Sequence, residues 1–107
     1  MTARDSVLSA VQLLASASEQ LSYDRDVPLA SVPAELAEAA GDLYQPKRRE
    51  YVEAFTDDEL RDLAHLYGLV REAAPGRADS VAELQRQPGW RRVLAVAKDL
   101  AARLAVP

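Results

Sequence analysis

The segment Thr56–Glu59 carries the signature of a helix start, and it constrains the fold more than any other feature of the chain. Thr56 stands at the N-cap position and Glu59 follows three residues later, which is the pattern of a capping box. Apolar residues then recur every three or four positions, the spacing of a helix with a buried face. The segment therefore predicts a long helix over residues 57–74.

The same apolar period predicts two more long helices, over residues 2–21 and 88–104. In the first of these, one seam runs through Val7, Val11, Leu14, Ser18 and Leu21. In the second, the stripe begins at Trp90, which we expect to be the largest single anchor of the core.

Shorter helices are predicted between the long ones. Ser31 can cap a helix that ends before Pro46, a second covers Lys47–Phe55, and a third follows the N-cap candidate Ser80. No strand-like alternation is present, and 107 residues suffice for one domain. The sequence therefore predicts an all-α fold, a compact bundle of five to six helices forming a single domain over residues 1–107.

The composition excludes several kinds of chemistry. The chain has no cysteine and one histidine, His65, which falls on the polar face of its predicted helix. Thiolate catalysis and cysteine-ligated zinc are therefore impossible, and the acidic residues after Thr56 are explained as charges in a first helical turn. We expect no catalytic activity, no metal and no cofactor.

The cellular setting is predicted from composition and from the lengths and flanks of the apolar stretches. No apolar run is long enough to span a bilayer, and the apolar stretch near the N-terminus lacks the basic start of a signal peptide. Arginine greatly outnumbers lysine and alanine is abundant. We expect a cytoplasmic bacterial protein that does not associate with membranes.

Charge is distributed unevenly along the chain. The net charge is −4, yet residues 1–85 hold 8 basic and 16 acidic side chains, whereas residues 86–107 hold 5 basic and 1 acidic. The C-terminal helix could dock on an acidic body, or it could offer a basic face to an anionic partner. The overall acidity opposes nonspecific binding of nucleic acid.

The favoured function is noncatalytic recognition of another protein. Three cations predicted in one first helical turn are unusual, because the helix dipole prefers anions there; nearby carboxylates such as Glu50 and Glu53 could compensate them. An apolar arc wider than one docking face needs is predicted for helix 57–74. The candidate partner-binding residues are Lys47, Arg48, Arg49, Asp57, Asp58, Asp62, Leu66 and Leu69.

Size, acidity and helicity suggest, by analogy only, a small immunity or antitoxin protein that masks its partner. The wide apolar arc, or the seam of helix 2–21, could instead form the interface of a homodimer.

Residues 80–104 support an alternative function. A short helix, a break at Gln87-Pro88-Gly89 and a second helix beginning near Arg91 and Arg92 have the outline of a helix–turn–helix. In that interpretation the chain is a nucleic-acid-binding regulator, and the two arginines contact the nucleic acid.

A second alternative rests on Ser80. The string Gly76–Leu84, with Asp79-Ser80-Val81 at its centre, resembles the Asp-Ser-Leu attachment motif of acyl and peptidyl carrier proteins. The resemblance implies a phosphopantetheine arm on Ser80. Valine replaces the leucine of that motif, and Pro88 limits the following helix to about two turns.

Overall fold

The computed structural model describes residues 2–26 and 31–105, and all regular structure in these ranges is helical. This confirms the predicted all-α bundle. The elements are α1 (Ala3–Ala15), α2 (Ala17–Asp26), α3 (Val32–Ala39), the 3-10 helix η1 (Ala40–Leu43), α4 (Arg49–Glu53), α5 (Asp57–Ala73), the 3-10 helix η2 (Pro75–Arg77), α6 (Val81–Arg86) and α7 (Pro88–Leu104).

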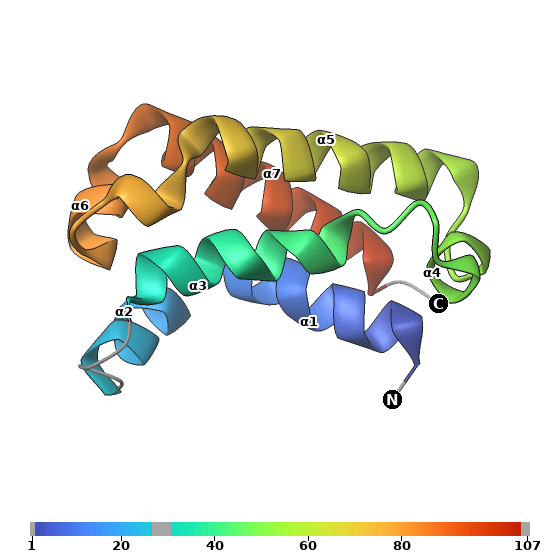
Figure 1. Ribbon diagram of the computed structural model, residues 1–107, viewed down its shortest axis with the longest axis horizontal. Coiled ribbons are helices and arrows are strands. Elements are labelled where there is room, and N and C mark those ends of the chain that lie inside the picture. Colours follow the sequence, from blue (N-terminus) through green and yellow to red (C-terminus); the bar gives the residue numbers. More distant parts are fainter. Residues whose placement is uncertain (1, 27–30, 106–107) are drawn as a thin grey trace.

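The long helices lie side by side along the 36 Å length of the molecule (Figure 1). Helix α7 packs against both α1 and α5, and η1 contacts α1 and α5 in turn. Helices α2 and α6 lie at one end, and α4 lies at the other end beside the start of α5. The two ends of the bundle are therefore built from different segments.

The sequence located α5 and α7 well. Thr56 and Glu59 form the predicted capping box, in which each side chain accepts a hydrogen bond from the other residue's backbone N–H. Helix α7 has the predicted bounds, and Trp90 is fully buried with Val93, Ala97 and Leu100 on the same face. The capping box of α5, Pro88 at the start of α7 and the apolar period were sufficient for these two helices.

The prediction of one helix over residues 2–21 was wrong. The chain breaks at Ser16, whose backbone is extended and whose hydroxyl accepts a hydrogen bond from the Glu19 N–H. Beyond the break the predicted seam is lost, because Ser18 and Leu21 are exposed. Gln20 points inward instead and is completely buried.

The central short segments differ less from expectation. Ser31 caps α3 through the Ala34 N–H, and Leu36, Ala40 and Leu43 are buried as predicted. Helix α4 is shorter than the predicted 47–55, and Tyr51 ties it to the end of η1 by donating a hydrogen bond to the Leu43 carbonyl. Burial raises the pKa of the Tyr51 phenol to about 12. This tie fixes the position of η1, and with it the surface described next.

Candidate protein-binding surface

Helix α3 and η1 form a ridge on the face of the molecule seen in Figure 1. Leu36, Ala40 and Leu43 anchor the ridge in the core, so the residues on its other side face solvent. The outward residues are small or acidic: Ala37, Glu38, Gly41 and Asp42 are all exposed. The ridge is therefore low and carries little bulk of its own.

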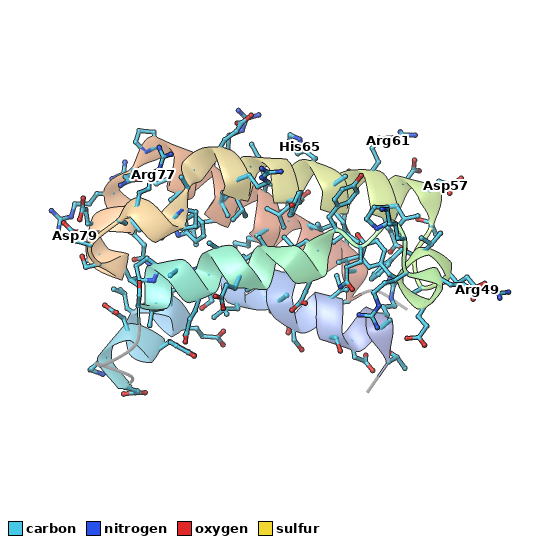
Figure 2. The ribbon with its side chains drawn as sticks, viewed as in Figure 1. Arg49, Asp57, Arg61, His65, Arg77 and Asp79 are labelled. Atoms are coloured by element: carbon cyan, nitrogen blue, oxygen red, sulfur yellow. The ribbon has the colours of Figure 1, made fainter. Side chains whose placement is uncertain are left out.

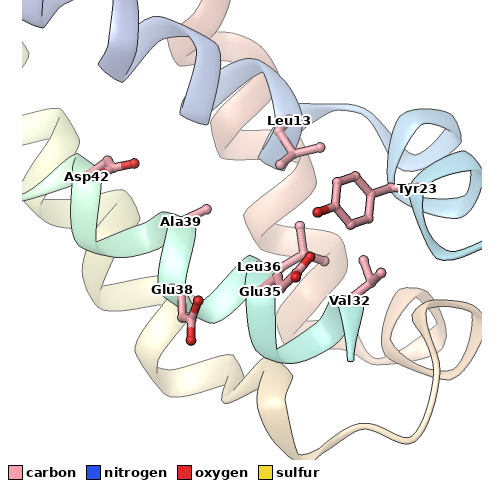
Figure 3. A pocket seen from close by; sticks show the side chains of 8 residues that line it. All are labelled: Leu13, Tyr23, Val32, Glu35, Leu36, Glu38, Ala39 and Asp42. Carbon is pink, nitrogen blue, oxygen red and sulfur yellow. The ribbon is translucent and has the colours of Figure 1, made fainter. Parts of the chain in front are cut away.

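A first hollow lies between this ridge and the α1–α2 segment (Figure 3). We call it the acidic hollow. Its volume is about 300 Å³, at the lower end of the range for ligand sites, roughly 300–1,000 Å³. It is lined by Leu13, Tyr23, Val32, Glu35, Leu36, Glu38, Ala39 and Asp42.

Glu35 is the most unusual group in the acidic hollow. Its Oε2 atom is buried and has no hydrogen-bond partner among the described residues. The interaction of the Tyr23 hydroxyl with the Glu35 carboxylate, together with that group's negative charge, raises the pKa of Tyr23. A buried carboxylate oxygen without a donor costs free energy in the unbound protein.

A second hollow, the tyrosine hollow, lies on the other side of the ridge, against the end of α5. Its volume is about 350 Å³, and it is lined by Ala37, Glu38, Ala40, Gly41, Tyr67, Val70, Arg71, Ala74 and Pro75. The rings of Tyr44 and Tyr67 are 5.2 Å apart, and the Arg71 guanidinium lies 5.7 Å from the Tyr67 ring centre. Tyrosine and arginine are the side chains that protein interfaces favour.

The net negative charge of the chain comes from the segment that contributes most of the residues lining the acidic hollow. Residues 17–45, which contribute α2, α3 and η1, hold six acidic side chains and one basic side chain, Arg25. The rest of the chain is nearly balanced. The acidic hollow, which is lined by three carboxylates and no basic residue, therefore has a field that attracts cationic groups.

The predicted basic trio is not the helical first turn that the sequence indicated. Lys47 precedes α4, Arg48 is its N-cap residue, and only Arg49 lies within it. Arg49 pairs with Glu53 at 2.8 Å, and Arg48 lies 3.9 Å from Glu50. Intramolecular carboxylates thus compensate both arginines, although Figure 2 shows Arg49 extending into solvent.

The predicted acidic residues are also engaged within the chain. Asp57 and Asp58 occupy the first turn of α5, where the dipole stabilises them, and Asp58 is 3.6 Å from Arg61. Asp62 accepts a hydrogen bond from Arg103 of α7. Their use by a partner stays a prediction.

Leu66 and Leu69 were wrongly assigned to a partner-binding flank. They are 0% and 8% exposed, because the side of α5 that packs in the core carries Leu63, Leu66 and Val70. Leu60, Ala64 and Tyr67, on the neighbouring part of α5, are only half-buried. The apolar arc of α5 is wide, as predicted, but the edge that packs into the core is the one that was expected to face a partner.

The two alternative functions remain untested predictions. Arg91 and Arg92 are exposed at the start of α7, and Arg91 donates a hydrogen bond to the Gln85 carbonyl. Only Gln87 separates α6 from α7, whereas a helix–turn–helix has a turn of about 3–4 residues. The Ser80 hydroxyl caps α6 by accepting the Glu83 N–H, which gives this serine a structural role.

Residues 2–26 and 31–105 also bear on the expectations about metals and membranes. In these ranges no group of three histidine or acidic side chains is placed to hold a metal ion. None of the helices is both long enough and apolar enough to cross a bilayer. His65 is exposed on α5, as predicted (Figure 2).

Comparison with known proteins gives no relative. No protein-family model, no curated protein and no solved structure matches the chain. The surface itself is therefore the guide to a function. Sequence reasoning missed the two hollows, and the one signal that pointed to them was the excess of acidic residues between positions 17 and 45.

Proposed function

We propose that this chain is a noncatalytic protein-binding module that masks a basic partner protein, in the manner of bacterial immunity or antitoxin proteins. The observation that carries the proposal is the α3–η1 ridge, with a hollow on either side and tyrosines at both hollows. The absence of cysteine and the arginine-rich composition support a bacterial cytoplasmic setting.

The chemistry of the surface favours a protein as ligand over a small substrate. The two hollows share Glu38 and are separated only by the narrow ridge, so one partner segment could occupy both. The outward ridge residues are small, which lets a partner backbone approach closely. The Arg71 guanidinium lies over the Tyr67 ring, and side chains that are positioned before binding lose less entropy on binding.

Substituting Ala37 by tryptophan tests the surface. Ala37 is exposed and lines the tyrosine hollow, so a tryptophan there obstructs the ridge without disturbing the core. Ala102→Trp on α7 is the matched control, because Ala102 is also exposed and lines neither hollow.

The measurement is affinity capture from the source organism, followed by calorimetry with the purified captured protein. We expect one basic protein to bind wild type and A102W, and to bind A37W at least about 30-fold more weakly, which corresponds to about 2 kcal/mol. Equal binding by A37W, or recovery only of a second copy of the chain, would contradict the proposal.

A further inference from the structure

The acidic hollow combines an apolar floor with a polar rim. Leu13, Val32, Leu36 and Ala39 form the apolar part, and three carboxylates and the Tyr23 hydroxyl form the polar part. Figure 3 shows the Tyr23 hydroxyl of α2 pointing toward the Glu35 carboxylate of α3. A group that fills this space must be apolar along its length and a hydrogen-bond donor at its end.

Among the lining residues, the Tyr23 hydroxyl is a side-chain donor, and it interacts with the Glu35 carboxylate but leaves the Oε2 atom of Glu35 without a partner. None of the lining residues is basic. Arg25, the one basic residue of the segment 17–45, lies instead beside Ser22 and Asp26, at 3.5 Å and 3.7 Å. The buried Oε2 atom of Glu35 can therefore accept a hydrogen bond, but none of the described residues donates one to it.

Resting on the proposed function, we infer that the acidic hollow receives an arginine side chain of the partner, with Glu35 as its counter-ion. The methylene stem of arginine buries well on an apolar floor while its charged end stays at a polar rim. A guanidinium has five donors, is less strongly hydrated than an ammonium group, and stacks on aromatic rings. It therefore matches several acceptor oxygens beside the Tyr23 ring better than lysine does.

The experiment titrates the isotope-labelled whole protein with N-acetyl-arginine amide at constant ionic strength and follows backbone amide resonances by NMR. The N-acetyl amides of glutamine and lysine serve as neutral and alternative cationic probes. We expect localised shifts at Leu13, Val32, Leu36 and Ala39, with a Kd on the order of millimolar. Lysine should bind more weakly than arginine, and glutamine should not bind.

Two variants locate the counter-ion. Glu35→Gln should raise the Kd for the arginine probe at least about fivefold. The matched control is Glu72→Gln, which removes the same charge from an exposed position of α5 outside both hollows and should leave the Kd unchanged. If E35Q does not fold, Glu38→Gln on the exposed part of the same hollow should weaken binding.

Three results would overturn the inference: no localised shifts with the arginine probe, equal shifts with the glutamine probe, or an unchanged Kd in E35Q. Because this titration uses no partner protein, its outcome is independent of the A37W capture experiment. A failed titration with successful capture would remove the arginine and keep the protein-binding function. Success in the titration with failed capture would show a cation-binding hollow and remove the proposed function.

Discussion

The two ends of the bundle are fastened by different chemistry. At the α2–α6 end, Gln20 is buried and neutral. Its Nε2 donates to the Leu13 and Leu14 carbonyls at 2.9 and 3.2 Å, and its Oε1 accepts from the Trp90 Nε1 at 3.0 Å and from Gln85 at 3.2 Å. One amide thus satisfies carbonyls that end α1 and joins them to α6 and α7.

At the α4–α5 end, the corresponding group is the partly exposed ion pair of Arg4 and Glu59. The Arg4 guanidinium makes two parallel hydrogen bonds to the Glu59 carboxylate, at 3.0 and 2.8 Å, and donates to the carbonyls of Ala54 and Leu104. It also lies 5.2 Å from the centre of the Phe55 ring. One cation thus connects the starts of α1 and α5 to the end of α7.

The difference predicts different responses to mutation and pH. The stability that a buried neutral network contributes changes little with pH and salt, but removing one member leaves its partners unpaired. A half-exposed ion pair is cheaper to lose and depends on ionisation. The α2–α6 end should therefore contribute more stability, and the α4–α5 end should carry the acid sensitivity.

The largest expected effect is that of Gln20→Ala. The substitution leaves a cavity and deprives the buried Trp90 N–H of its acceptor, so we expect a loss of about 3 kcal/mol in the free energy of unfolding. Gln12→Ala is the control, since Gln12 is exposed on α1. Urea denaturation measures both, and a loss below about 1 kcal/mol for Q20A would refute the importance of the network.

The next effect is that of Arg4→Ala. Loss of the bidentate pair and of two carbonyl contacts should cost about 2 kcal/mol at pH 7. Arg61→Ala, which removes an arginine from an exposed pair with Asp58, should cost less than about 0.5 kcal/mol.

The same pair predicts the acid dependence. Hydrogen bonds from Arg4 and from the Thr56 N–H, together with the positive charge of Arg4, lower the pKa of Glu59 from 4.5 to about 2. Because the pKa is lowered on folding, this contribution is complete above pH 4.5 and is lost as the pH falls towards 2, by about 1–3 kcal/mol. Denaturation at a series of pH values should show this loss of stability at low pH in wild type and in Q20A, but not in R4A. An equal change of the unfolding free energy with pH in wild type and R4A would contradict the prediction.

The smallest effect is a gain in stability. Ala74, which ends α5, has a φ of 46° and lies in the left-handed region, where an alanine is strained and a glycine is not. Ala74→Gly should stabilise the protein by about 0.5–1 kcal/mol, seen as a higher midpoint in thermal denaturation. Ala102→Gly, at an exposed position inside α7, should instead destabilise it by about 1 kcal/mol.

The missed break at Ser16 shows where sequence reasoning fails. Ser18 and Leu21 continue the heptad spacing of Val7, Val11 and Leu14, so the local pattern favours one helix. The break is stabilised by Gln20, whose partners include Trp90, seventy positions away. No local window contains both residues, and a buried glutamine has no apolar signature.

The candidate surface was harder to predict than the fold for the same reason. An apolar arc on α5 predicts that a helix packs, but it does not say which edge faces α7, and so Leu66 and Leu69 were misplaced. Each hollow is formed by segments distant in sequence. Tyr23 and Asp42, for example, line one cavity from two different elements.

The sequence by itself determined the helical class, the caps at Thr56, Ser31 and Ser80, the bounds of α7 and the burial of Trp90, because capping and apolar period are local properties of the chain. Only the tertiary structure decided the turn at Ser16, the joining of Arg4 to Glu59 and the hollows on either side of α3. These depend on which helices meet, and buried polar groups are stable only where distant segments supply their partners.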